Sequence, residues 1–330
     1  MPSNVTEPLV LVAGAVPEPA RREPRTYPGR GLAPSADPER LERVLRERMP
    51  NAVGAGEDEL AAVEARLGVP LPAELRAVLR VTRAEWSEQR DIEALGGVEL
   101  FGLDGIERAS EADVRKGIPF PFLAAKAAVT GPDAAVQGLV DPPCWIVVGD
   151  HGGGSGDWVA VDLMPGPAGH VGQLVVVSHE EEIGAQLLAE SFTALVLDGG
   201  IEDYEDNPGE APPYAVMVDS KQGHCVAAVA TAELEVLRIG VWDAEPSDLT
   251  PLVGLPRLRT LIAHPGKIAD PGVIGCLKGL EYLEIGPDEW EALLAADAVP
   301  RSLLAAGVSG YGHDPARVGA IYRALTRIWS

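Results

Sequence analysis

The stretch EDELAAVEARLGVPLPAELRAVLRVT at residues 57–82 has the apolar spacing of two consecutive helices. Leu60, Val63 and Leu67 recur every three or four residues, which places them on one face of the first helix. Pro72 suits the start of the second helix, because proline is accommodated in the first helical turn. The residues that this second helix turns inward are Leu75, Val78 and Leu79. Two short helices joined by GVPLP are the first distinctive pattern along the chain.

The residues before this helix pair divide into an irregular segment and one more helix. Residues 1–36 are rich in proline, glycine and arginine and lack a sustained period, so we expect them to be mostly irregular. Asp37 is a good N-cap and Pro38 a good first residue, which predicts a helix from there onward. The apolar face of this leading helix contains Leu41, Val44, Leu45 and Met49.

Beyond Val98 the apolar period changes from helical spacing to alternation. The segments VELFGL, CWIVVGD, DWVAVDL and GQLVVVSH therefore read as strands, and Trp158, Ala160 and Asp162 fall on one side of their strand. Residues 180–199, EEEIGAQLLAESFTALVLDG, are predicted to form a helix. Its apolar stripe consists of Ile183, Leu187, Leu188, Phe192 and Leu195.

The run GDHGGGSGD at residues 149–157 lies between two of these strands and raises the question of a phosphate-binding or catalytic loop. It has no lysine and a strand follows it, so it lacks both the lysine and the helix N-terminus of a P-loop. A serine nucleophile elbow also requires a following helix. Asp150, His151, Asp157 and Asp162 leave a metal site open as an alternative, but without the usual histidine spacing. We expect a hairpin connection with Asp162 near a strand end, and hence no catalytic residue, no metal and no cofactor.

The chain is strongly acidic. Its 330 residues include 50 acidic and 27 basic residues, which gives a formal charge of −23 and a pI near 4.6. Such a surface repels phosphate backbones and so argues against direct binding to nucleic acid. It attracts a basic protein partner, whereas acidity that serves solubility alone is the alternative.

The cysteines and the N-terminus indicate the compartment. Cys144, Cys225 and Cys276 are far apart and form no CxxC pair, which is typical of a reducing cytoplasm. The apolar piece Leu9–Val16 is short and follows Glu7, so neither a secretory signal nor a membrane span is predicted. The expected location is the cytoplasm.

The C-terminal part contains a repeat. LEVLRI at 234–239, LRTLIA at 258–263 and LEYLEI at 280–285 share one leucine pattern, at spacings of 24 and then 22 residues. This pattern is typical of leucine-rich repeats, in which each unit buries its leucines by stacking on the next. The final DPARVGAIYRALTRIW is amphipathic and could cap the array. The alternative is an unrelated α/β domain in which the leucine spacing arises by chance.

The residues between the consensus positions of such strands line an exposed concave face. One row is Val236, Thr260 and Tyr282, and the next row is Arg238, Ile262 and Glu284. Because aromatic residues and arginine are frequent hot spots, we expect these six residues to form a protein-binding face.

The order of these segments resembles the SUKH superfamily, named for the Smi and Knr cell-wall regulators of yeast. The resemblance covers roughly Glu57–Gly199: the helix pair with its LP turn, ELFGLDGIERA, the strand–glycine turn–strand run from Gly149, and the closing IGAQLLAESFTALVLDG. Two departures fall where loops vary in the family. Thr82–Arg83 replaces an asparagine–glycine turn, and PFLAAKAAVTGPDAAVQGLVDPP is an insertion-like run.

The resemblance implies an α+β fold. We expect a SUKH-like mixed α/β domain with a central antiparallel sheet flanked by helices, followed by a short leucine-rich-repeat-like α/β solenoid. The expected boundaries are 37–205 for the SUKH-like domain with its leading helix, 206–213 for a linker and 214–330 for the repeat domain with its capping helix.

Bacterial members of the family resemble cytoplasmic immunity proteins that lack a catalytic set and bind toxin domains, many of them nucleases. The resemblance therefore implies a non-enzymatic binding module that neutralises a toxin domain with a basic surface, without contact to nucleic acid or membrane. A regulatory or scaffold protein that binds partners through its repeat region is the alternative, and an unrecognised enzyme is the third hypothesis.

Overall fold

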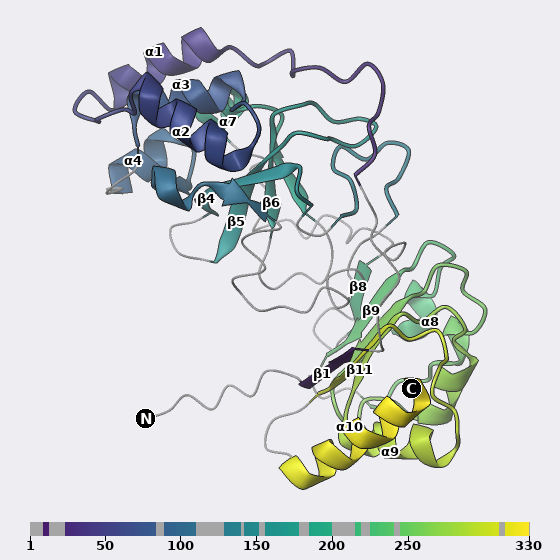
Figure 1. Cartoon of the computed structure of the whole chain (residues 1–330). Helices are drawn as coiled ribbons and strands as arrows, with labels where there is room; N and C mark the ends of the chain where they lie inside the picture. The colour runs from purple at the N-terminus through teal and green to yellow at the C-terminus, as the bar shows by residue number, and fades with distance from the viewer. Residues whose placement is uncertain are drawn as a thin grey trace. The chain divides into compact units, whose positions relative to one another are not determined.

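The computed structural model describes residues 9–12, 24–83, 89–109, 129–139, 142–151, 156–177, 185–199, 215–218, 225–240, 245–309 and 314–329. These residues form two compact units (Figure 1). The first unit contains the described residues from 24 to 199, and the second contains strand β1 (Leu9–Val12) and the described residues from 215 onward. Among all these residues, no helix is long and apolar enough to cross a membrane.

The first unit has five helices among its described residues, and the first three bury the apolar faces that the sequence predicts. The five helices are α1 (Pro38–Arg48), α2 (Glu57–Leu67), α3 (Ala73–Val81), α4 (Gln89–Ala94) and α7 (Phe192–Asp198). The Asp37 side chain caps α1 by accepting a hydrogen bond from the Arg40 N–H. Gly68 ends α2 in the left-handed conformation, with a φ of 68°. The predicted leading helix and the predicted helix pair are confirmed.

The sheet of the first unit is antiparallel. Its strands are β2 (Val98–Leu100), β3 (Glu107–Arg108), β4 (Trp145–His151), β5 (Asp157–Asp162), β6 (Gln173–Val177) and β7 (Gln186–Ala189). The spatial order is β2-β4-β5-β6-β7, with β3 also paired to β4 and a 3-10 turn, η2 (Leu103–Gly105), before β3. This antiparallel sheet with its helices fits the expected α+β class.

Both faces of this sheet are covered. Val159 and Val161 of β5 belong to the large core that the helices share with one face of the sheet. Ala160 belongs to a smaller cluster on the other face. The buried members of that cluster are Ala109, Cys144, Trp145, Val147, Ala160 and Val175. The predicted alternation along β5 is thus confirmed.

The buried carboxylate of Glu74 joins three helices. Glu74 lies in the first turn of α3 and has only 6% of its surface exposed. Its Oε2 accepts from the Phe192 N–H at 3.1 Å, and its Oε1 accepts from the Thr193 N–H at 3.1 Å and the Thr193 hydroxyl at 2.5 Å. The Asp37 N–H donates to the same Oε1 at 3.3 Å. One carboxylate therefore serves the N-termini of α1 and α7, where unpaired amides and helix dipoles favour negative charge.

The predicted helix over residues 180–199 is wrong at residues 186–189. Gln186–Ala189 form β7, which pairs with β6, and only Phe192–Asp198 form α7. Ser191 begins the helix, because its hydroxyl accepts from the Ala194 N–H at 2.9 Å and so caps α7. The described apolar residues of the predicted stripe therefore come from two elements, and Ile183 lies outside the described residues.

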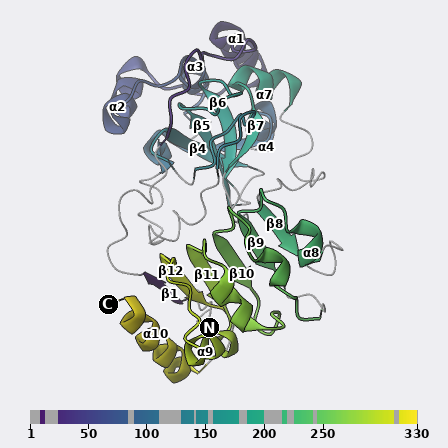
Figure 2. The ribbon, with the colours of Figure 1, turned by 90° about the vertical axis from the view of Figure 1, so that its right-hand side faces the viewer.

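The second unit is built on a six-stranded, mostly parallel sheet (Figure 2). In spatial order its strands are β1, β12 (Ala305–Val308), β11 (Tyr282–Ile285), β10 (Thr260–Ala263), β9 (Val236–Ile239) and β8 (Ala215–Val218). The strands from β8 to β12 are parallel, and β1 is antiparallel to β12. The helical segments are α8 (Val226–Val229), η3 (Thr250–Leu252), η4 (Pro271–Cys276), α9 (Pro287–Ala295) and α10 (Pro315–Trp329).

The predicted repeat strands lie side by side in register. Val236, Thr260 and Tyr282 are register partners, and the register continues to Ala215 in β8 and to Ala305 in β12. From β8 to β12 the strands recur at steps of 21, 24, 22 and 23 residues. The leucine pattern did not predict β8 and β12, because their sequences, AVMV and AAGV, contain no leucine.

The N-terminal segment contains one strand that the prediction of a mostly irregular segment did not include. Leu9–Val12 adds β1 to the sheet of the second unit, where Leu9 pairs with Val308. Residues 24–36 belong to the first unit, and there the Arg25 N–H donates to Gln137 Oε1 at 2.9 Å. The first unit therefore begins before the predicted boundary at residue 37. The predicted linker at 206–213 lies outside the described residues.

Candidate functional site

The six residues predicted to bind a partner lie on one face of the parallel sheet. Strand register aligns them in the two predicted rows. The first row is Val236, Thr260 and Tyr282, and the second row is Arg238, Ile262 and Glu284. The structure thus brings all six residues together on β9, β10 and β11.

The expectation that both rows are exposed is wrong for four of these residues. The buried residues, with 7% or less of their surface exposed, are Val236, Thr260, Ile262 and Tyr282. Arg238 and Glu284 are half-buried. Parallel sheets are generally covered on both faces, and their strands carry apolar residues at successive positions. The open concave face assumed from the repeat pattern does not describe these four positions.

Tyr282 fills this face of the sheet. Its hydroxyl donates a hydrogen bond to Glu284 Oε2 at 2.7 Å, and its side chain belongs to a small buried cluster with Ile262 and Ala305. A Cβ atom at Gly307 would lie 2.9 Å from the Tyr282 hydroxyl oxygen, so glycine leaves room for the tyrosine. The position of Tyr282 is that of a core residue.

The glycine-rich run between β4 and β5 has the predicted hairpin geometry at its ends. His151 is the register partner of Asp157, and the Gly156 N–H donates to Asp150 Oδ2 at 3.0 Å. Residues 152–155 lie outside the described residues. An antiparallel strand follows the run, which confirms a hairpin connection.

Asp162 ends β5, as predicted, and is a buried carboxylate. Its Oδ1 accepts from the Met164 N–H at 2.9 Å, and its Oδ2 accepts from Gln173 Nε2 at 3.0 Å. Burial raises the pKa of Asp162 to about 6, and hydrogen bonds from Met164, Gln173 and Trp145 oppose this effect. Gln173 Nε2 also donates to the Ala135 carbonyl at 2.8 Å. Because Gln173 on β6 contacts both the Asp162 carboxylate and the Ala135 carbonyl, the carboxylate helps to hold the irregular segment around Ala135 against the sheet.

The three cysteines lie in the described part of the chain, where Cys144 is buried and Cys225 and Cys276 are exposed. Burial raises the pKa of the Cys144 thiol to about 12, so this thiol stays protonated at neutral pH. Cys225 precedes α8 and Cys276 ends η4. Across the described ranges, no group of three or more His, Cys, Asp or Glu side chains could hold a metal ion.

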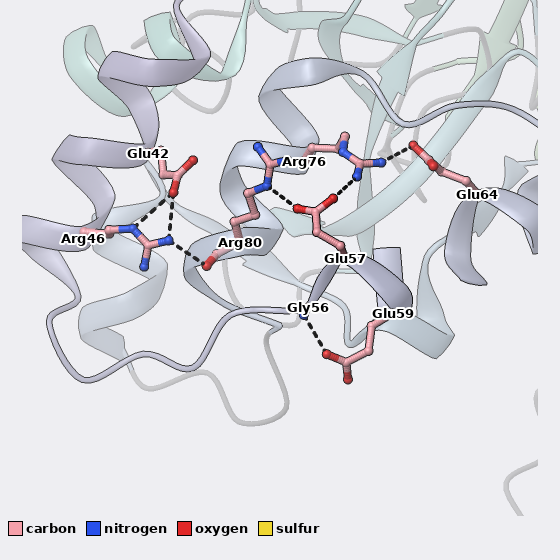
Figure 3. A network of polar contacts seen from close by, with 8 residues as sticks. All are labelled: Glu42, Arg46, Gly56, Glu57, Glu59, Glu64, Arg76 and Arg80. Atoms are coloured by element: carbon pink, nitrogen blue, oxygen red, sulfur yellow. Dashed lines mark hydrogen bonds and ion pairs between the residues drawn. The ribbon is translucent and has the colours of Figure 1, made fainter. Parts of the chain in front are cut away.

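Charged side chains form a network over α2 and α3 (Figure 3). Glu57 accepts from Arg76 Nη2 at 2.5 Å and from Arg80 Nε at 2.8 Å, and Glu64 accepts from Arg76 Nη1 at 2.6 Å. Sequence reasoning missed this network. Arg76 and Arg80 lie one turn apart on α3, but nothing local to α3 identifies their partners on α2.

These contacts keep the carboxylates of the network ionised. Hydrogen bonds from Arg80 and Arg76 lower the pKa of Glu57. The Gly56 N–H lowers the pKa of Glu59, and the Leu71 N–H followed by Arg76 lowers the pKa of Glu64. The charges on this helical surface therefore neutralise one another within the first unit.

One comparison with known families finds a match within the first unit. Residues 54–198 match the model of the SMI1 / KNR4 family (SUKH-1). The matched range includes α2, α3 and the whole antiparallel sheet, and it ends with the last residue of α7. The match supports a SUKH domain in this part of the chain. No curated protein matches the chain.

Proposed function

We propose that this chain is a non-enzymatic protein-binding module of the immunity type, which binds a bacterial toxin domain in the cytoplasm and neutralises it. The observation that carries the proposal is the SUKH-1 match over residues 54–198. Protein binding needs no catalytic residue. This accords with the structural roles of Asp162, Cys144 and the hairpin between β4 and β5.

The charge distribution favours a basic partner. Residues 24–83 contain ten arginines and nine acidic residues, so the helical part with α1, α2 and α3 is almost neutral. The remaining sequence contains 41 acidic and 17 basic residues. A toxin domain with a basic surface, such as a nuclease that binds phosphate, is therefore attracted to the acidic remainder of the chain.

Rescue of growth tests this proposal. A toxin domain encoded beside this chain in its own genome is expressed with or without the full chain, and growth and direct binding are both measured. We expect rescued growth and a complex that weakens as salt is raised, because salt screens the attraction between unlike charges. Normal toxicity in the presence of the folded chain would count against an immunity function.

A regulatory or scaffold protein is the second candidate, and the parallel sheet of the second unit favours it. We also propose that this unit is a short leucine-rich-repeat-like solenoid, supported by strands that recur at 21 to 24 residues in register. Arg238 and Glu284 are the accessible members of the predicted binding rows. On this hypothesis, Arg238→Glu weakens partner binding while toxin rescue is unaffected.

A further inference from the structure

Strand β8 is the last strand of the parallel sheet. It pairs on one side with β9, and in the described part of the chain no strand pairs with its other side. Natural edge strands are often protected by charged residues or by proline. The sequence of β8 is AVMV and contains neither.

The backbone direction of β8 identifies the groups that face outward. The Gly240 N–H donates to the Val218 carbonyl at 2.9 Å, so this carbonyl points toward β9. Backbone groups of alternate residues point to opposite sides of a strand, so Val216 shares this direction. Ala215 and Met217 therefore direct their N–H and C=O groups away from β9. These two residues present donors and acceptors to an added strand.

The side chains at this edge are apolar on both faces of the sheet. Val218 is buried in the helix-side core of the unit, and Val216 packs against that core. Ala215 and Met217 alternate with them and lie on the other face. Ala215, Val216 and Met217 are all partly exposed. An added strand would thus gain apolar contacts along with its main-chain hydrogen bonds.

The other edge of the same sheet shows how such a strand is accommodated. There β1 pairs antiparallel with β12, although these strands lie at opposite ends of the chain. The sheet therefore accepts an extended segment of four residues that is remote in sequence. Antiparallel addition at β8 would give this sheet an added strand at each edge.

The negative charge of the chain favours a basic strand as the binding partner of β8. Residues 201–210, IEDYEDNPGE, lie outside the described residues; in the sequence they precede β8 and contain five acidic residues and no basic residue. A second copy of this chain is disfavoured, because each copy carries a formal charge of −23. We propose that the outer edge of β8 is the docking site for an extended basic strand of a partner protein. This inference rests on the proposed protein-binding function and names the surface that contacts the partner.

The test uses the full chain and a synthetic peptide of alternating valine and lysine, about eight residues long, as an extended basic strand. Amide hydrogen exchange is measured with and without the peptide. We expect protection of the Ala215 and Met217 amides, with little change at Val216, whose amide already faces β9. A peptide with glutamate in place of lysine is the charge control.

Met217→Pro removes one outward donor and leaves the hydrogen bonds to β9 in place, because proline is tolerated where the strand N–H faces outward. We expect it to weaken the peptide about tenfold or more, whereas Met217→Leu retains binding. Unchanged melting of the second unit shows that both variants are folded. If Met217→Pro does not fold, protection of the two amides in the parent chain decides the question.

Three results would overturn the proposal. The folded Met217→Pro variant could bind the peptide as tightly as the parent chain, or the peptide could leave the Ala215 and Met217 amides of the parent chain unprotected. Protection of these amides without peptide, by dimers that form as the concentration rises, would also overturn it. Growth rescue separates this inference from the proposed function. Rescue by a toxin domain that leaves both amides unprotected would refute the β8 site alone. Failed rescue with normal protection by the peptide would refute the immunity function alone.

Discussion

Replacing Glu74 with alanine tests whether a single buried carboxylate holds the helices of the first unit together. Its four donors are the Asp37 N–H, the Phe192 N–H, and the N–H and hydroxyl of Thr193. The Asp37 N–H has a second acceptor, because it also donates to the Thr193 hydroxyl oxygen at 3.1 Å. The Phe192 and Thr193 amides in the first turn of α7 lose the acceptor that Glu74 supplies to them.

The expected destabilisation follows from these two amides and from the lost charge. Each buried donor without an acceptor costs about 1–3 kcal/mol. The carboxylate also interacts favourably with the dipoles of α1 and α7, which alanine removes. We therefore expect Glu74→Ala to lower the free energy of unfolding of this unit by about 3–5 kcal/mol. Glu74→Gln keeps one acceptor oxygen and should lose less.

Amide hydrogen exchange of β5 in the full chain measures this change, because buried central strands report the opening of the whole unit. Glu47→Ala is the matched control, since Glu47 is exposed on α1 and such changes alter stability by about 0.5 kcal/mol or less. A loss below about 1 kcal/mol in Glu74→Ala would refute the assigned role, because one unsatisfied buried amide alone costs that much.

Three further substitutions probe other closely packed positions. Burial raises the pKa of Asp162 from 3.8 to about 6, so its contribution to stability is greatest below pH 4 and is lost as the pH rises through 6. The free energy of unfolding falls by about 3 kcal/mol over this pH range. Asp162→Asn should abolish this part of the pH dependence when unfolding by urea is followed at several pH values. An unchanged pH dependence in this variant would contradict the role of Asp162. Tyr282→Ala should destabilise the second unit by about 3 kcal/mol or more, whereas Arg257→Ala, at an exposed position, should cost less than about 1 kcal/mol. Equal melting temperatures would place the tyrosine outside the core. Gly54→Ala should lower the free energy of unfolding of the first unit by about 1–3 kcal/mol. The new Cβ would lie 1.8 Å from a backbone carbonyl oxygen of α3. Gly31→Ala is the control, because its Cβ would meet nothing within 4 Å, and it should match the parent chain in urea unfolding.

The helix pair at residues 57–82 could be predicted because its determinants are local. The apolar spacing, Pro72 and Gly68 define two helices without reference to the rest of the chain. The secondary structure after residue 180 was harder to predict, since Leu187 and Leu188 fit a helical stripe and a strand equally well. Ser191 decides between them, but its role as an N-cap depends on the pairing of β7 with β6.

The candidate binding rows show a different limit of sequence reasoning. The leucine spacing correctly predicted which residues of β9, β10 and β11 are neighbours, because register follows from repeat length. Exposure does not follow from repeat length, since it depends on whether other parts of the chain cover the second face. The apolar side chains of Val236 and Ile262 indicate a covered second face, because buried parallel strands carry apolar residues on both faces.

The N-terminal strand shows what a division of the chain along the sequence alone leaves out. Four apolar residues at 9–12 carry little information alone, and their partner AAGV lacks the repeat pattern. Only the antiparallel pairing of β1 with β12 reveals that the described residues of the second unit come from two separate pieces of sequence, with the SUKH domain between them. The chain before the SUKH domain leads from β1, and the chain after it leads to β8. Those two strands are the two edges of one sheet. A segment that begins at the predicted boundary of residue 214 would therefore lack β1 and leave β12 as an unpaired edge, with backbone groups that favour aggregation.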